Sequence, residues 1–466
     1  MVNKTNIQAA PTTISIPKIR SDFPDRVIAP GDPEYDKART VFYGGVDRRP
    51  AVIIRVADSN DVVRVVNLAR ESGLPLAVRS GGHSAVGHSV CDDGIVLDLS
   101  NMKDLQIDPE SRTAWAETGL TAGELTTATA AHGLAVGFGD TGSVGIGGIT
   151  LGGGVGYLVR KYGLTIDNLL AAEVVTADGQ TRHVDEQTHS DLFWAIRGGG
   201  GNFGVVTRFK FQLHEVPSVV GGMLILPATP DTIAGFMAES EAAPEELSGI
   251  GNVMFAPPMP FLPQETHGKL IIMAFLVYAG EAAAGERALA PFRALATPLA
   301  DMLKPMPYPE IYPPEEGEYH PIAASHTMFM DRVDRSVAET IVEHLQSSTA
   351  SMKVAQLRVL GGAMARVPVD ATAFAHRKSK IMVNIAALYE NPEEKAMHEA
   401  WVADFASALL QSDQGAYVNF LGDEGEARIR AAYPGATWDR LVEVKARYDP
   451  TNLFRLNQNI PVLGPQ

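Results

Sequence analysis

The chain has 466 residues, which at about 150 residues per domain predicts roughly three domains or lobes. Its 39 Lys and Arg residues against 55 Asp and Glu residues give a formal net charge of −16. This charge argues against a nucleic acid or an anionic membrane as the main partner, because both require clustered positive charge. The single cysteine, Cys91, excludes an intrachain disulfide and any cysteine-based metal cluster, and no metal site is expected.

No targeting or membrane segment stands out. The first twenty residues lack the apolar run of a signal peptide. The longest apolar run, residues 270–279, is about half the length that a bilayer requires. We therefore expect a cytoplasmic protein that is not attached to a membrane.

The chain begins with a Pro-rich stretch, residues 1–45, which predicts a wrapping segment with little regular structure. A short strand is then predicted at 51–56. A helix follows, capped by Ser59 and ended by Gly73, and a second strand is predicted at 76–78. Such a βαβ unit favours a parallel pair of strands.

Further elements are predicted in the same region, and the pattern of predicted strands and helices changes near residue 215. Up to that point, the patterns predict a strand at 113–117, a helix between Thr121 and Gly133 with a Thr121–Glu124 capping box, and an alternating strand at 205–213. Beyond it, strands are predicted at 223–226, 253–256, 270–277 and 381–387, with Ala- and Glu-rich helices at 280–294 and 392–410. This predicts a separate lobe, residues 215–414, with an antiparallel sheet covered by helices. Residues 415–466 carry turn and capping signals but no core of their own, so they are predicted to pack on the first lobe.

Glycine is over-represented, at 44 of 466 residues, and it gathers in three clusters at 79–84, 142–156 and 197–204. Without Cβ atoms, backbone N–H groups can approach an anion such as a pyrophosphate closely. A purely structural glycine-rich turn is the alternative for the cluster at 142–156, and a surface or core histidine without a catalytic role is the alternative for His83 in the first cluster. Neither the dinucleotide fingerprint of a standard Rossmann site, nor a P-loop, nor a serine-hydrolase elbow fits these segments.

Five segments in fixed order are more specific. They are RSGGHSAVGHSV (79–90), TGSVGIGGITLGGGVGYLVRKYGLTIDNL (141–169), DLFWAIRGGGGNFGVVT (191–207), YVNF (417–420) and RYDPTNLFRLNQNIP (447–461). From about residue 45 to 461 the chain resembles the berberine bridge enzyme-like FAD-linked oxidases of the vanillyl-alcohol oxidase/PCMH flavoprotein superfamily. The resemblance implies an α+β fold. A PCMH-type FAD-binding domain would be split between residues 46–214 and 415–466, and a substrate domain would span 215–414.

The resemblance also implies how FAD is held. His83 stands where the family joins an imidazole to the 8α-methyl group of FAD. Members with a second tether carry cysteine at the position of Thr141, so FAD bound covalently through His83 only is implied. Val144 matches the position near flavin C4a that gates dioxygen, where valine accompanies oxidases and Ile or Leu accompanies dehydrogenases. The other positions assigned to FAD are Arg79, Ser80, Gly81, Gly82, Ser84, His88, Ser89, Gly142, Gly145, Gly148, Gly152, Gly154, Val155, Gly156, Val206, Asn457 and Asn459.

Four residues are candidates for catalysis. Relatives often carry a carboxylate at the position of Gln356, and an amide cannot accept a proton, so base catalysis from that position is in doubt. Tyr417 and Asn419 resemble the family's active-site YxN pair. Tyr417 is predicted to be a base or a hydrogen-bonding partner, with Arg358 either keeping it anionic or binding an acidic substrate. The alternative is that Tyr417 only packs and that Arg358 is a solvated charge.

The reaction implied is hydride transfer from an activated C–H of a small-molecule alcohol, sugar or amine to flavin N5. Dioxygen would then reoxidise the flavin and yield hydrogen peroxide. A dehydrogenase with another electron acceptor is the alternative among enzymes, and a nucleotide-binding protein without activity is the alternative from another class.

Overall fold

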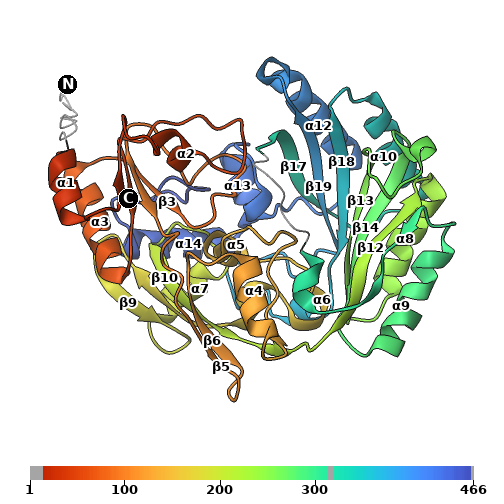
Figure 1. Cartoon of the computed structure of the whole chain (residues 1–466), viewed down its shortest axis with the longest axis horizontal. Coiled ribbons are helices and arrows are strands. Elements are labelled where there is room, and N and C mark those ends of the chain that lie inside the picture. The colour runs from red at the N-terminus through yellow and green to blue at the C-terminus, as the bar shows by residue number, and fades with distance from the viewer. Residues whose placement is uncertain (1–13, 313–319, 463–466) are drawn as a thin grey trace.

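The computed structural model describes residues 14–312 and 320–462. Two parts lie side by side in Figure 1, one holding elements from both ends of the chain and the other holding one large sheet. Helices and strands are mixed in both parts, which confirms the predicted α+β class.

A four-stranded sheet forms the first layer, in the order β1-β2-β4-β3. Its strands are β1 (Val27–Ile28), β2 (Val52–Arg55), β4 (Ile95–Asp98) and β3 (Leu76–Arg79). β2 and β3 run parallel, as the βαβ pattern predicts, but they do not pair with each other, because each pairs with β4 between them. Helix α3 (Ser59–Ser72) connects them, and its N-cap is Asp58 rather than Ser59, since the Asp58 carboxylate accepts from the Asp61 amide at 2.9 Å.

The described part of the N-terminal segment is more regular than its composition predicts. It holds the helices α1 (Ile16–Asp22) and α2 (Tyr35–Arg39) as well as β1. Its apolar side chains Ile28 and Tyr35 are buried against residues of β2 and β4. The segment is therefore anchored to the first sheet through both strand pairing and packing.

A five-stranded antiparallel sheet forms the next layer, in the order β5-β6-β10-β8-β9. Its strands are β5 (Leu105–Asp108), β6 (Thr113–Glu117), β10 (Val205–Gln212), β8 (Leu169–Val175) and β9 (Thr181–Val184). Helix α4 (Ala122–Ala130) carries the predicted Thr121–Glu124 capping box. Shorter elements complete this part: β7 (Leu134–Ala135), α5 (Ile146–Gly152), α6 (Val159–Tyr162), α7 (Ser190–Ile196) and β11 (His214–Glu215).

An eight-stranded antiparallel sheet dominates the second part, as predicted for this stretch of the chain. Its strands are β12 (Val219–Pro227), β13 (Leu247–Phe255), β14 (Leu270–Tyr278), β15 (Ala300–Asp301), β16 (Lys304–Met306), β17 (Ile322–Met330), β18 (Met352–Val359) and β19 (Ile381–Tyr389). The main path runs β15-β12-β14-β13-β18-β19-β17. Its outer face is covered by α8 (Pro230–Ala242), α9 (Ala282–Ala294), α10 (Arg335–Ser347) and α12 (Lys395–Leu409) (Figure 1). Apolar side chains from this face and the helices form one buried core. On the opposite face, Ile250 of β13 and Val277 of β14 are buried with Tyr157 of the first part, and positions on β17, β18 and β19 are left free to border a site.

The C-terminal stretch returns to the first part. It contains α13 (Glu426–Ala432) and α14 (Ala436–Tyr448). The short helix α11 (Ala363–Arg366) belongs to the second part, between β18 and β19. Trp438 and Leu441 of α14 are buried in the same cluster as Phe209 of β10. The buried Lys445 ammonium pairs with Asp449 at 2.7 Å and also donates to two backbone carbonyls. The last described residues are thereby fixed beside the glycine cluster that follows α7.

Candidate active site

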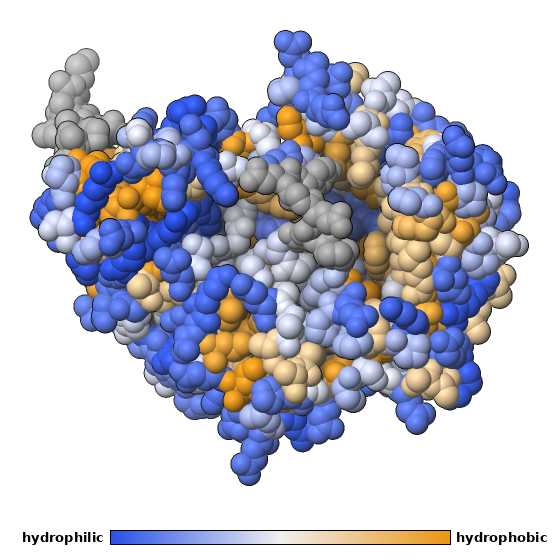
Figure 2. Space-filling view, viewed as in Figure 1, coloured by the Kyte–Doolittle hydropathy of each residue, from blue (hydrophilic) through white to orange (hydrophobic). Residues whose placement is uncertain are grey.

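A cavity of about 530 Å³ lies between the two parts of the molecule. Its walls come from the loop after β3, the segment around α5, the glycine cluster after α7, the free face of the large sheet and the C-terminal stretch. Figure 2 shows the surface hollowed between the two parts. The volume falls within the range of roughly 300–1,000 Å³ that is usual for sites of small molecules and cofactors.

Backbone forms one wall because two glycine segments touch each other there. A Cβ atom on Gly81 would lie 2.2 Å from the Gly145 nitrogen, and one on Gly145 would lie 2.3 Å from the Gly81 nitrogen. Ser80 locks this contact, since its hydroxyl donates to the Thr118 carbonyl at 2.6 Å and accepts from the Gly147 amide at 3.2 Å. Gly148 differs, because a Cβ there would meet nothing within 4 Å although the residue lines the cavity. Its hydrogen atom faces the space that a ligand would fill.

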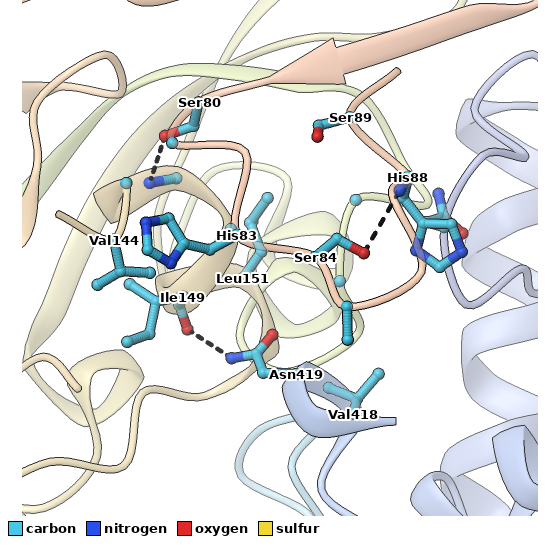
Figure 3. A pocket seen from close by; sticks show the side chains of 18 of the residues that line it. Ser80, His83, Ser84, His88, Ser89, Val144, Ile149, Leu151, Val418 and Asn419 are labelled. Carbon is cyan, nitrogen blue, oxygen red and sulfur yellow. Dashed lines mark hydrogen bonds between the residues drawn. The ribbon is translucent and has the colours of Figure 1, made fainter. Parts of the chain in front are cut away.

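His83 follows this wall and is held on two sides. Its Nε2 atom lies 3.0 Å from the Ser143 hydroxyl. Its imidazole stacks on the Phe42 ring, with centroids 4.3 Å apart and planes at 19°. Figure 3 shows His83 beside Val144, with Asn419 across the same part of the cavity. His83, the predicted attachment point of FAD, and Val144, the predicted oxygen gate, thus line the same part of the cavity.

His88 lines the same cavity from the loop that begins at His83. Burial lowers the pKa of its imidazole from 6.5 to about 4, and the nearby Arg48 adds to this effect. The side chain is therefore neutral at physiological pH.

This lowered pKa predicts a loss of stability in acid. Between pH 6.5 and 4 the unfolded chain binds a proton at His88 that the folded chain does not, so the free energy of unfolding falls as pH falls. We expect His88 to contribute a loss of about 2 kcal/mol between pH 7 and pH 5. Urea unfolding of the wild type and of His88→Gln at the two pH values should show this difference. The other titrating groups are the same in both proteins, so their contributions cancel in the comparison. Equal losses in the two proteins would contradict a neutral, buried His88.

Tyr417 and Asn419 form a hydrogen-bonded pair at the floor of the cavity. The Tyr417 hydroxyl accepts from the Gly154 amide at 3.0 Å and from Asn419 Nδ2 at 2.9 Å. Asn419 Nδ2 also donates to the Ile149 carbonyl at 3.0 Å (Figure 3). Burial raises the pKa of the Tyr417 phenol above its usual value, and the hydrogen bonds only partly offset this. The phenol is therefore protonated, and because its oxygen already accepts two N–H groups, its own O–H is a donor.

The structure supports neither role predicted for Arg358. Arg358 does not keep Tyr417 anionic, because burial outweighs its effect on the phenol pKa. It is not placed to bind an acidic substrate either, because its side chain is 4% exposed and forms an ion pair with Asp140. It is also no solvated charge. The guanidinium instead links the FAD side to the large sheet, donating to the Val155 carbonyl and to Gln356 Oε1 at 3.4 and 2.6 Å.

Most of the predicted FAD positions line the cavity, but several do not. Lining residues from the prediction are Ser80, Gly81, Gly82, His83, Ser84, His88, Ser89, Thr141, Val144, Gly145, Gly148, Val155, Val206 and Asn457, together with Gln356, Tyr417 and Asn419. The predicted positions outside the lining are Arg79, Gly142, Gly152, Gly154, Gly156, Arg358 and Asn459.

Packing within the protein explains these differences. Arg79 is buried in an ion pair with Asp98 at 2.8 Å, which ties the ends of β3 and β4 together. A Cβ on Gly152 would lie 2.0 Å from the Asn419 amide oxygen. Cβ atoms on Gly154 and Gly156 would collide with Thr165 and with the Phe138 carbonyl. These glycines are therefore required by the chain's own contacts.

Several lining residues escaped prediction. Phe42 and Tyr43 come from the N-terminal segment, and Ser325 and Asn384 come from β17 and β19. Asn384 lies opposite Gln356 in the β18–β19 register, a proximity that no local pattern in the sequence encodes. Asp140 is the only Asp, Glu, Lys or Arg among the described lining residues. The only local signal for Phe42 and Tyr43 is that two consecutive aromatic residues stand directly before a pair of glycines.

The residues present fit a flavin dinucleotide. Ser89 and Asn457 line the cavity, and their buried Oγ and Oδ1 atoms have no hydrogen-bond partner among the described residues. Buried polar atoms are normally paired, so a polar ligand or an ordered water is expected at these two atoms. Glycine backbone at Ser80–Gly82 and Gly145, together with these polar atoms, would hold FAD, and the large sheet would face its reactive ring.

No helix in residues 14–312 or 320–462 has both the length and the apolar character needed to cross a membrane. Within the same residues, no group of three or more His, Cys, Asp or Glu side chains is placed to hold a metal ion.

Comparison with known proteins identifies the family. Residues 50–185 match the family model described as an FAD binding domain, and residues 416–461 match the model described as berberine and berberine like. An FAD-linked oxidoreductase of Bacillus subtilis is 33% identical, covering 94% of this chain and 98% of the relative. (R)-6-hydroxynicotine oxidase of Paenarthrobacter nicotinovorans is 30% identical, covering 94% of this chain and 97% of the relative.

A solved structure agrees with these matches. The crystal structure of 6-hydroxy-D-nicotine oxidase from Arthrobacter nicotinovorans superposes with a TM-score of 0.84 at 27% identity, covering 93% of this chain and 97% of the other. The family models and the full-length relatives together establish an FAD-linked oxidoreductase. The chain belongs to the berberine bridge enzyme-like FAD-linked oxidoreductases.

Proposed function

We propose that this FAD-linked oxidoreductase is an oxidase of a small molecule carrying an activated C–H bond, on a carbon that bears oxygen or nitrogen. When bound, FAD would accept hydride at N5 and pass the electrons to dioxygen, which gives hydrogen peroxide. The observation that carries this proposal is that His83, Val144 and the Tyr417–Asn419 pair line one cavity, opposite Gln356 on the large sheet. The full-length similarity to a relative named (R)-6-hydroxynicotine oxidase supports the oxidase assignment.

Each of the candidate residues would have a separate role. His83 would tether FAD covalently and alone, since Thr141 lines the cavity where a second tether would require cysteine. Tyr417 would donate its O–H to the oxygen or nitrogen borne by the carbon that loses hydride, and Asn419 would fix the direction of that O–H. Gln356 would orient the substrate from the sheet. Arg358 would act through Gln356, because it does not reach the cavity itself.

A dehydrogenase with another acceptor is the alternative, and the rate of reoxidation separates the two. The holoenzyme is reduced with dithionite without oxygen and mixed with air-saturated buffer while flavin absorbance is followed. An oxidase is reoxidised within seconds, and a half-life of many minutes would show that dioxygen is not its acceptor. A screen for peroxide with alcohols, sugars and amines would then identify substrates.

Val144 provides a sharper test of the oxygen gate. We expect Val144→Leu to slow reoxidation several-fold, because the larger side chain fills space beside the flavin face, whereas Val144→Ala should keep the wild-type rate. Substrate reduction of the flavin should change less than reoxidation in Val144→Leu. Equal reoxidation rates in all three proteins would show that Val144 does not control access, while leaving the oxidase assignment intact.

A further inference from the structure

A continuous chain of polar side chains runs under the cavity from the FAD side into the large sheet. Asp140 pairs with Arg358, whose Nη2 also donates to Gln356 Oε1 at 2.6 Å. Gln356 Nε2 donates to Asn252 Oδ1 at 3.0 Å. Asn252 Nδ2 donates to the Met273 carbonyl at 3.1 Å. We refer to Asp140, Arg358, Gln356 and Asn252 as the polar chain.

The direction of every hydrogen bond in the polar chain is fixed from both ends. A guanidinium only donates, so the group of Gln356 that faces Arg358 must be its oxygen. A backbone carbonyl only accepts, so Asn252 must turn its nitrogen toward Met273 and its oxygen toward Gln356. Both constraints require the Gln356 nitrogen to face Asn252. Rotating the Gln356 amide by half a turn would set N–H against N–H and oxygen against oxygen.

The position of the polar chain decides which part of Gln356 a ligand meets. Gln356 lines the cavity, whereas Arg358 is buried beneath it and Asn252 lies outside the lining. The charge-assisted bond from Arg358 holds the amide oxygen toward the buried guanidinium. Asp140 balances that buried charge, and removing it would leave Arg358 unpaired. The second Nε2 hydrogen has no partner among the described residues.

We propose that Asp140 and Arg358 are positioning residues that lock Gln356 as a hydrogen-bond donor to the substrate. The substrate then carries an acceptor at this place, such as a hydroxyl, carbonyl or ether oxygen, and an ammonium group is disfavoured there. This inference rests on the proposed function, because it takes the cavity as the place where the substrate is oxidised. It goes further by assigning a polarity to the part of the substrate that faces the sheet.

Two probes of the same shape test this polarity without turnover. Acetophenone and α-methylstyrene differ in a carbonyl oxygen against a methylene group, and their binding to the holoenzyme is measured through the change in flavin absorbance. In Gln356→Glu, which keeps the shape and removes the N–H donor, acetophenone should bind about five-fold more weakly relative to α-methylstyrene than in the wild type. The greater polarity of glutamate acts against the apolar probe, so it cannot produce this result.

Variants of the other residues separate positioning from contact. Arg358→Met combined with Asp140→Asn removes the constraint on the Gln356 oxygen and leaves the amide held by a single neutral hydrogen bond to Asn252. The preference for acetophenone should therefore fall although Gln356 is intact. Arg358→Lys keeps a cationic donor and should retain the preference. Asp167→Asn is the matched control, because it alters another buried ion pair, with Arg377, that does not involve Gln356. It should lower the melting temperature without changing the preference.

An unchanged ratio of the two affinities in Gln356→Glu, or no response of the wild type to acetophenone, overturns the proposal. If the double variant folds and keeps the preference, the positioning role of Asp140 and Arg358 is wrong. If the double variant does not fold, the ratio of the two affinities in Gln356→Glu alone tests the proposal. Absence of peroxide formation would refute the oxidase assignment alone, because the probes report binding and not reaction.

Discussion

Substitution of His83 by alanine should release all of the flavin from acid-precipitated protein, whereas the wild-type pellet should stay yellow. Only a covalent bond survives denaturation, since every other contact with FAD depends on the folded cavity. His83 is suited to such a bond because Phe42 fixes the plane of its imidazole and Ser143 occupies Nε2. Mass spectrometry of the peptide that contains residues 79–90 should find the flavin adduct only in the wild type.

The matched control lies five residues along the same loop. His88→Gln removes a second imidazole that lines the cavity but should retain the adduct on His83. A colourless wild-type pellet would contradict covalent attachment altogether. An adduct that persists in His83→Ala would place the bond on another residue.

A second large effect is expected from two alanine substitutions in the glycine wall. Gly81→Ala should lower the melting temperature markedly even without FAD, because its new methyl group would meet the Gly145 nitrogen at 2.2 Å and backbone cannot move aside cheaply. Gly148→Ala should leave the unliganded protein as stable as the wild type or slightly more so, because it adds a helix-favouring residue within α5. It should nevertheless weaken FAD binding, since its methyl group would point into the cavity.

Thermal unfolding of both variants in the His83→Ala background, where no covalent bond to FAD can form at this position, separates these effects when it is measured with and without added FAD. Flavin retained after gel filtration gives the binding readout. If Gly148→Ala binds FAD as the wild type does, the dinucleotide does not approach this residue. If Gly81→Ala unfolds at the wild-type temperature, the two glycine segments are farther apart than the structure shows.

Much of the fold was accessible from sequence because its signals are local. The alternation at 205–213 encodes β10, and the capping box at Thr121 marks the start of α4. The family segments locate the residues around His83 and Tyr417. Glycine density was less informative, because a missing Cβ can face a ligand, as at Gly148, or the protein itself, as at Gly152 and Gly154.

What sequence could not provide is pairing between distant segments. Gln356 lies beside Asn252 and Asn384 only through the registers of β18 with β13 and β19. Asp140 and Arg358 are 218 positions apart, so their ion pair depends on how the two parts are placed. The sequence therefore cannot assign the partner of Arg358, because a cation two residues from Gln356 has the same local pattern whether it pairs with a substrate, a phenolate or a carboxylate.

The division of the cavity between both ends of the chain sets an order for biosynthesis. Phe42, near the start, and Asn457 and Gln458, near the end, line the same space. The strands of the four- and five-stranded sheets all precede the large sheet in the chain, whereas Asn457 and Gln458 follow it. The cavity that would hold the cofactor therefore has all of its walls only after the large sheet has been synthesised.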